Sequence, residues 1–185
     1  WGNIINIPAR ALTEGEFVIV PSGYKQEKEI KEISIKTDYK IRNYKKISKE
    51  IEMSPEFMRL MGYYIAEGFT NYQGVFLNFG SHEGEFVKDS QECFKKIFGI
   101  ETTINIPHPT AIRVCAYSKT MSKIFLEEIE AGDSALKKKM PYFLFDVNEN
   151  LKKQFLNALF KGDGHMRRGY EASYGTSSKE LATQL

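Results

Sequence analysis

The sequence predicts an α+β fold in which two similar units each begin with a strong helix. Helical and strand-like patterns alternate along the chain, and neither dominates. The segments at 60–68 and 156–164 also share the order of their small, aromatic and acidic residues. We therefore expect repeated helix–strand units, the second unit being incomplete because few residues follow its helix.

The composition of the 185-residue chain is that of an ordinary globular protein. Hydrophobic residues make up 42% and charged residues 27%, which excludes a disordered or collagen-like chain. The longest apolar runs are far shorter than the ~20 residues that a membrane helix needs, so we expect no membrane association. The net charge of +2 does not by itself indicate nucleic acid, so the distribution of charge is more informative.

The two cysteines, Cys93 and Cys115, have no Cys-x-x-Cys spacing, which excludes a zinc ribbon or a disulfide scaffold. We expect both to be small core residues in a reducing compartment, and hence a cytoplasmic, intracellular protein.

Residues 1–23 have the pattern of short strands separated by turns. Residues 24–53 then contain nine Lys or Arg mixed with six acids. This range is interpreted as a basic linker, either a solvated connecting segment or an arm that follows a nucleic-acid backbone.

The first unit begins with a helix at 54–67, for which Ser54 is the N-cap, Pro55 the first residue and Gly68 the residue that ends it. The pattern then predicts a strand at 75–79, an amphipathic helix at 84–98, strands at 102–106 and 111–117, and a helix capped by Ser118. The second unit is predicted to have a helix at about 148–162, a hairpin through Gly169, and a last helix opened by a capping box at 177–180.

Small residues lie four apart in both strong helices, at Gly62 and Ala66 and at Ala158 and Gly162. Residues four apart share a helix face, and a glycine inside a helix costs ~0.5–1 kcal/mol relative to alanine. Close packing of the two helices would offset this cost, although small residues could also occupy these positions by chance.

An acid ends each of these helices, Glu67 in the first and Asp163 in the second. The helix dipole disfavours a carboxylate at this end, so stability does not explain the placement. Each acid alone could be a solvated helix end. As a pair at matched positions they indicate a site for a divalent cation such as Mg²⁺, which prefers oxygen ligands.

The two segments resemble the paired motifs of the LAGLIDADG (dodecapeptide) homing endonucleases. The first matches the form Leu-x-Gly-Tyr-x-x-Ala-Glu-Gly, and the second matches Phe-Leu-x-x-Leu-Phe-x-Gly-Asp-Gly. Lys139-Met140-Pro141 resembles the Lys-x-Ile-Pro element of that family, and residues 176–182 resemble its next block. The resemblance covers residues 54–185.

The resemblance implies pseudo-twofold αββαββα repeats with curved antiparallel sheets, the first at 54–148 and a truncated second at 149–185. It implies a site-specific endonuclease that hydrolyses double-stranded DNA with Mg²⁺ or Mn²⁺. The metal would be held by Glu67, Asp163 and the backbone carbonyls of Ala66 and Gly162, and Lys139 would act in catalysis.

The strands would place their outer face in the major groove of the DNA. Each candidate reader could equally be a solvated sheet residue. The candidates are Thr103, Asn105, Arg113 and Tyr117 in the first repeat and Arg167, Arg168, Tyr170 and Tyr174 in the second.

Residues 1–23 resemble the end of the N-terminal splicing half of an intein, with Glu16 in place of the usual Asp. This implies an endonuclease module inside a host protein, monomeric when both repeats are complete. The splicing residues are absent, so we expect a fragment that does not splice by itself. Two alternatives remain: a non-cleaving LAGLIDADG nucleic-acid-binding protein (a regulator or RNA-splicing maturase), or a decayed intein insert.

Overall fold

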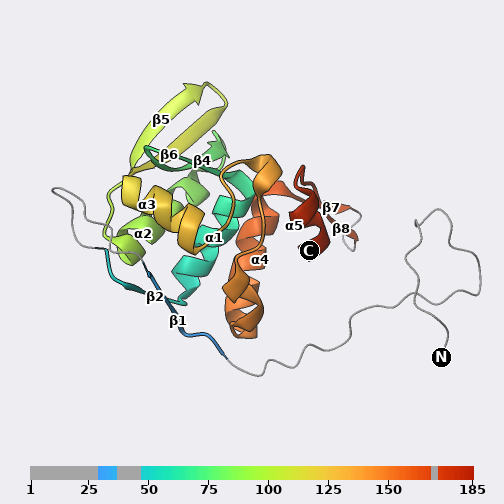
Figure 1. Cartoon of the computed structure of the whole chain (residues 1–185). Coiled ribbons are helices and arrows are strands. Elements are labelled where there is room, and N and C mark those ends of the chain that lie inside the picture. The colour runs from blue at the N-terminus through green and yellow to red at the C-terminus, as the bar shows by residue number, and fades with distance from the viewer. Residues whose placement is uncertain (1–28, 37–46, 168–170) are drawn as a thin grey trace, which may run out of the picture.

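A computed structural model of the chain describes residues 29–36, 47–167 and 171–185 (Figure 1). The splicing-like segment expected at 1–23 and the hairpin turn at Gly169 lie outside these residues. Within the described ranges no helix is both long and apolar enough to cross a membrane.

The centre of the fold is a pair of helices, α1 (Pro55–Glu67) and α4 (Glu149–Asp163), which pack along each other (Figure 1). Both begin at a capping side chain. Ser54 Oγ accepts a hydrogen bond from the Phe57 amide at 3.3 Å, and Asn148 Oδ1 accepts one from the Leu151 amide at 3.0 Å. The two helices predicted from the sequence are therefore present, with bounds within one residue of those expected.

A four-stranded antiparallel sheet lies over the first helix. Its strands are β3 (Gly68–Asn71), β4 (Gly74–Gly80), β5 (Thr103–His108) and β6 (Ala111–Tyr117), in the order β3-β4-β6-β5. Strand β3 starts at the residue directly after α1 and pairs with β4 from Gly68 opposite Leu77. The sequence did not predict β3, because four residues are too few to show an alternating pattern.

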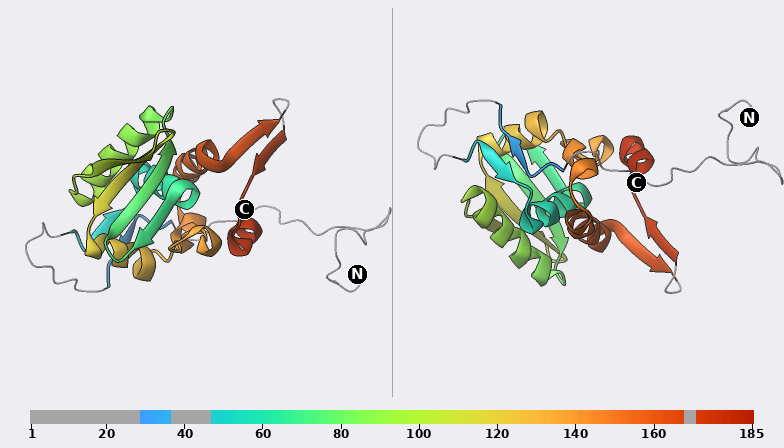
Figure 2. Two further views of the ribbon diagram at one scale, coloured as in Figure 1. Left: turned by 90° about the horizontal axis from the view of Figure 1, so that it is seen from above. Right: turned by 90° about the horizontal axis from the view of Figure 1, so that it is seen from below.

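The inner face of the sheet is apolar and packs on α1 and α2 (Gly84–Phe98). Val75, Leu77 and Val114 are fully buried there. Gly99, with a φ of 64°, ends α2 in the left-handed conformation that favours glycine. The views in Figure 2 show the helices on one side of the sheet only, so its other face is open.

The first unit ends with α3 (Lys119–Lys123), which continues into a π-helical turn, η2 (Ile124–Glu128). Two 3₁₀ turns, η3 (Ala135–Lys137) and η4 (Tyr142–Asp146), then lead to α4. The element order from α1 to α3 is αββαββα, as expected for one LAGLIDADG repeat.

The second unit repeats the first four element types of the first. After α4 come β7 (Gly164–Arg167), β8 (Glu171–Tyr174) and α5 (Lys179–Gln184). The β7–β8 ribbon projects away from the body of the fold (Figure 2). Ser178 caps α5, with Oγ 3.2 Å from the Leu181 amide, so the cap lies one residue later than the predicted capping box.

A two-stranded ribbon packs against the helix pair within the range expected to be a basic linker. It consists of β1 (Glu32–Ser34) and β2 (Glu50–Glu52). Ile33 and Ile51 are buried in the core, and the Ile30 amide donates to the Asp146 carbonyl at 2.9 Å. The exposed neighbours of Ile33 are Glu32 and Ser34, and those of Ile51 are Glu50 and Glu52. The described part of 24–53 is therefore an integral part of the domain and does not form a basic strip.

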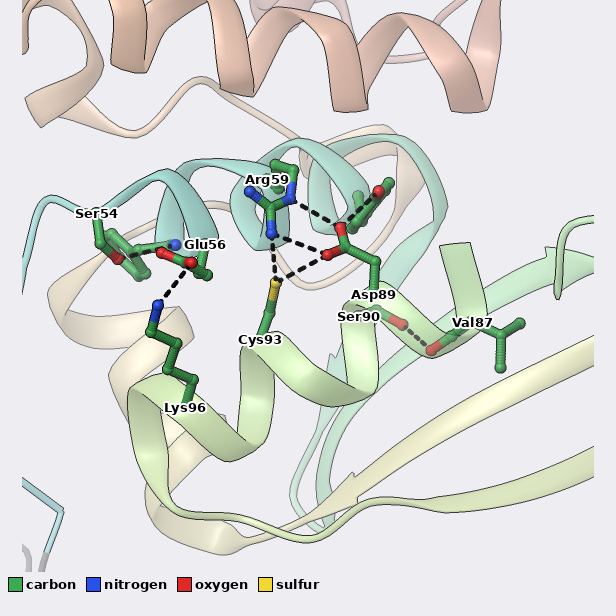
Figure 3. A network of polar contacts seen from close by, with 10 residues as sticks. Ser54, Glu56, Arg59, Val87, Asp89, Ser90, Cys93 and Lys96 are labelled. Atoms are coloured by element: carbon green, nitrogen blue, oxygen red, sulfur yellow. Dashed lines mark hydrogen bonds and ion pairs between the residues drawn. The ribbon is translucent and has the colours of Figure 1, made fainter. Parts of the chain in front are cut away.

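A polar network fixes α2 against α1 (Figure 3). Arg59 of α1 forms a two-pronged ion pair with Asp89 of α2, with N–O distances of 2.8 and 2.9 Å, and Tyr63 donates to the same carboxylate at 2.9 Å. Although burial opposes it, these hydrogen bonds lower the pKa of Asp89. Cys93 lies beside them, and burial raises its pKa to about 12. Both cysteines are buried and unpaired, as predicted.

Candidate metal and nucleic-acid site

The four small residues of the two motifs meet where α1 and α4 touch. A Cβ placed on Gly62 would lie 2.5 Å from the Phe155 carbonyl oxygen and 2.7 Å from Ala158 Cβ. A Cβ on Gly162 would lie 2.5 Å from Ala66 Cβ. Matched positions of the two motifs therefore contact each other, which is the arrangement that a twofold axis between the helices produces.

This contact brings Glu67 across to the second helix. Glu67 Oε1 lies 3.2 Å from the position that a Cβ on Gly162 would occupy. Asp163 is the next residue of α4, at the end that corresponds to Glu67. The two acids expected to form a pair are therefore at the same end of the helix pair.

The electrostatics of the pair reflect this proximity. Burial raises the pKa of Glu67 to about 7, and the carboxylates of Asp163 and Glu83 add to the rise. Burial also raises the pKa of Asp163, although the Tyr174 hydroxyl, 3.3 Å from Asp163 Oδ2, opposes this shift. Two carboxylates that resist ionisation next to each other form a site where a divalent cation would be stabilising.

The donor set suits a hard cation that retains water. Among the described residues no group of three or more His, Cys, Asp and Glu side chains is arranged to hold a metal ion. Glu67 and Asp163 could supply two carboxylates, and Ala66 and Gly162, expected to add carbonyl oxygens, lie in contact at the same junction. Mg²⁺ commonly binds through one or two carboxylates and several waters, which this junction can accommodate.

Two neighbouring lysines have different environments. Lys139, expected to be catalytic, forms an ion pair with Glu130 at 2.9 Å. Lys138 is only 2% exposed, and its Nζ donates to the Tyr64 carbonyl at 2.7 Å and lies 3.3 Å from the centroid of the Tyr64 ring. Burial lowers the pKa of Lys138 well below its usual range.

The sequence interpretation did not single out Lys138. The pattern Lys-x-Ile-Pro places its lysine three positions before proline, and Lys138 has this spacing from Pro141, with Met140 in place of isoleucine. Lys139 is one position too late. The structure places Lys138 under the last turn of α1, where Tyr64 precedes Glu67 by three residues.

The candidate DNA readers of the first repeat lie together on the open face of the sheet. Arg113 pairs with Asn78 on one side and Asn105 on the other, and Thr103 pairs with Cys115. Tyr117 is 50% exposed at the end of β6. Phe69 and Asn78 share this face but were not among the predicted readers, because β3 was not predicted and β4 appeared mainly apolar.

The candidates of the second repeat are less well placed by the structure. Arg167 ends β7, and Arg168 and Tyr170 lie outside the described residues. Tyr174 contacts the carboxylate of Asp163, so its hydroxyl belongs to the acidic site.

Comparison with known proteins supports the same assignment. A family described as "LAGLIDADG-like domain" matches residues 54–130, which include α1, the whole sheet and α3. Residues 54–130 are a LAGLIDADG-like domain. The match confirms the resemblance seen in the first motif.

Curated relatives share this domain and its flanks. An uncharacterized protein of Methanocaldococcus jannaschii is 29% identical over 84% of this chain and 19% of its own length. The DNA polymerase II large subunit of Thermococcus kodakarensis is 28% identical over 86% of this chain and 8% of its own length. An iron-sulfur cluster assembly SufBD family protein of Mycobacterium tuberculosis is 27% identical over 97% of this chain and 19% of its own length. The chain thus spans about a fifth or less of these relatives.

Proposed function

We propose that the chain is a double-stranded DNA endonuclease whose centre is formed by Glu67 and Asp163. The observation that carries the proposal is the meeting of two matched helices through small residues, which places an acid of each helix at one end. The raised pKa of Glu67, to about 7, supports a site that gains from a bound cation. The LAGLIDADG-like domain at 54–130 supports a nuclease rather than another metal-binding function.

Different residues of the chain would have different roles in phosphodiester hydrolysis. Glu67 and Asp163, with the carbonyls of Ala66 and Gly162, would hold Mg²⁺ or Mn²⁺, which when bound activates water and stabilises charge on the scissile phosphate. Lys138 is held by the carbonyl of Tyr64, three residues before Glu67, and would stabilise negative charge that develops at this end of α1. Lys139 remains a candidate for stabilising negative charge at the surface.

We also infer that the chain is an insert carried by a larger host, as expected for an intein-borne endonuclease. Similar segments occur in a DNA polymerase subunit and in an iron-sulfur cluster assembly protein, and occupy 8% and 19% of those proteins. The names of these two proteins describe unrelated activities, which supports a module that is independent of the function of the protein that contains it. Sequencing the flanks of this chain tests the inference, because a splice junction before it and a terminal His-Asn after it are expected.

The endonuclease proposal can be tested without a known target. Duplexes that bind the chain in EDTA are first selected from a randomised library, and are then incubated with Mg²⁺ or Mn²⁺. We expect cleavage by the wild type only with metal, and binding without cleavage by Glu67→Gln and by Asp163→Asn. Glu101→Gln is the matched control, because Glu101 is an exposed acid paired with Lys95 on α2.

Three results would count against the proposal. Unchanged cleavage by Glu67→Gln or Asp163→Asn would remove these residues from the metal site. Binding by the wild type without cleavage under either metal would favour the non-cleaving nucleic-acid-binding alternative or a decayed insert. Failure to select any duplex would contradict DNA binding itself.

A further inference from the structure

The open face of the sheet contains a polar row that crosses three strands. Asn78 of β4, Arg113 of β6 and Asn105 of β5 are direct cross-strand partners. Direct partners in an antiparallel sheet point to the same face, and neighbouring strands lie about 4.8 Å apart. The three side chains therefore form a short line on the face that no helix covers (Figure 2).

Arg113 is fixed within this row by two contacts. Its Nε donates to Asn78 Oδ1 at 2.7 Å, and its guanidinium carbon lies 5.2 Å from the centroid of the Phe69 ring. Phe69 is itself stacked on Phe76, with centroids 5.0 Å apart and an interplanar angle of 19°. The guanidinium is thus oriented before any ligand arrives, which lowers the entropy lost on binding.

The contacts leave the outer end of the guanidinium available. Nε is occupied by Asn78, and in the described part of the chain no carboxylate pairs with Arg113. Its two terminal nitrogens make no hydrogen bond to the described residues. Arg59 differs, because its Nε and one terminal nitrogen are both used in the two-pronged ion pair with Asp89.

The chemistry of this pair selects among the bases. Asn78 Oδ1 is engaged by Arg113, so the pair presents N–H donors outward. In the major groove guanine offers two adjacent acceptors, O6 and N7, whereas adenine and cytosine each present an amino donor at the corresponding edge. A guanidinium that offers its terminal nitrogens end-on matches guanine bidentately and meets an amino donor on adenine or cytosine. Thymine offers only one acceptor, O4, beside its methyl group, so it cannot accept both hydrogen bonds.

We propose that Arg113, positioned by Asn78 and Phe69, reads a guanine of the DNA target in the major groove. The inference rests on the proposed function, since it requires that the open face of the sheet binds double-stranded DNA. Arg113 is the residue that contacts the base, and Asn78 is a positioning residue that acts through Arg113.

The same randomised duplex library tests the inference by binding alone. For the wild type we expect one position at which guanine is selected and at which any other base weakens binding roughly tenfold. Arg113→Ala and Arg113→Lys should reduce this ratio to near one and leave the other positions unchanged, because lysine keeps the charge but not the two-pronged geometry. Lys95→Ala, which removes an exposed charge from α2, should leave all preferences unchanged.

Variants of Asn78 test whether this residue positions Arg113 or only stabilises the fold. Asn78→Ala should lower the guanine ratio without lowering the melting temperature, and Asn78→Asp, which keeps an acceptor for Arg113, should restore it. A uniform loss of affinity in Arg113→Ala, with the guanine ratio intact, would mark a phosphate contact and overturn the inference. Sequence-selective binding in which no guanine preference depends on Arg113 would also overturn the inference, but it would not contradict the proposed function. Absence of any DNA binding would overturn both.

Discussion

Glu67 occupies a position that folding alone would not select. The residue ends α1, where the helix dipole is already negative, and the second helix with Asp163 lies against it. Its pKa is raised to about 7 from an ordinary value of 4.5, mainly by burial. The folded chain therefore holds the proton of this carboxyl more tightly than the unfolded chain does.

The sign of this shift predicts how the metal-free protein responds to pH. Ionising Glu67 costs folding free energy that is absent below about pH 4.5 and complete above about pH 7. Glu67→Gln should therefore stabilise the metal-free chain at pH 8, on the order of 1 kcal/mol after allowing for residual solvation, and have little effect at pH 4.5. Thermal melts in EDTA at the two pH values measure this difference. An equal effect at both would show that the carboxyl is not desolvated.

Lys138 and Lys139 should respond differently to the same substitution. Lys138 is buried, and within the described ranges no carboxylate forms a hydrogen bond with it, so its charged form is costly. Lys139 has an exposed ion pair. We expect Lys138→Met to raise the free energy of unfolding at pH 7 by about 1 kcal/mol and to abolish cleavage. The stabilisation should shrink towards pH 10, where the unfolded lysine also loses its proton.

Lys139→Met is the matched control. Loss of its exposed ion pair with Glu130 should change stability by less than about 1 kcal/mol. Cleavage activity of the two variants on a selected duplex decides between the lysines. Retained cutting by Lys138→Met together with loss in Lys139→Met would restore the assignment of Lys139.

At the scale of elements, the contact between α1 and α4 determines the geometry of the acidic pair. Gly62 faces Ala158, and Gly162 faces Ala66, so each closest approach combines one glycine with one alanine. A second Cβ at either place would overlap the partner helix. Separation of the helices by even one methyl group would move Glu67 away from Asp163.

This packing predicts a rescue by moving one methyl group across the interface. Gly162→Ala would place its Cβ 2.5 Å from Ala66 Cβ and 3.2 Å from Glu67 Oε1, and should destabilise the fold by about 1–3 kcal/mol. The added change Ala66→Gly should recover much of this loss, apart from the intrinsic cost of a helical glycine. Gly84→Ala is the control, since no atom lies within 4 Å of its added Cβ. Chemical denaturation of the wild type, Gly162→Ala, Ala66→Gly and the double variant measures the coupling free energy between the two positions. Strict additivity would contradict the contact.

The sequence predicted the elements whose residues show a periodic pattern, and it missed those too short to show one. Helices α1 and α4 have capping side chains, and α2 has apolar spacing and ends at Gly99, so their bounds followed closely from the residues. Strands β1, β2 and β3 have only three or four residues each, which is too few to show an alternating pattern. Gly68 was predicted to end the helix and does so, with an extended backbone. A Cβ there would lie 2.5 Å from the Tyr64 carbonyl, so contact explains the glycine.

The acidic pair was predictable because it repeats within the sequence, whereas the lysine was not. A repeat gives two independent copies of the same spacing, which identified Glu67 and Asp163 together. The environments of Lys138 and Lys139 depend on how residues 134–141 fold over α1, and adjacent lysines are equivalent in composition. They differ in their spacing from Pro141 and in the burial of Lys138 against Tyr64.

At the scale of the whole molecule, the two units have similar first helices, but the matched apolar residues of these helices differ in burial. Leu60 and Leu156 occupy matched positions in the two motifs. Leu60 is fully buried in the core beneath the first sheet, while Leu156 is 46% exposed. Met166 of β7 is also 52% exposed, so the described second unit presents apolar surface, as expected from the sequence.

This asymmetry predicts different responses to truncation of the two leucines. Leu60→Ala should cost about 2–5 kcal/mol, because it opens a cavity in a closed core. Leu156→Ala should cost less than about 1 kcal/mol, because its side chain still contacts water in the folded chain. Urea denaturation of the two variants at one pH checks the difference. Similar losses would show that Leu156 is covered in solution.

The direct connection of α1 to β3 has a consequence for where the proposed enzyme would cleave relative to the bases that it recognises. Glu67 is the last residue of the helix, and Gly68 is the first of the sheet, so no hinge separates them. The backbone that would follow the groove is continuous with the backbone that carries the acid. The number of base pairs between those contacted and the bond that is broken would then be set by the fold. Changing which bases Arg113 and its neighbours prefer should alter where along a genome the cut falls, but not its offset from the recognised bases.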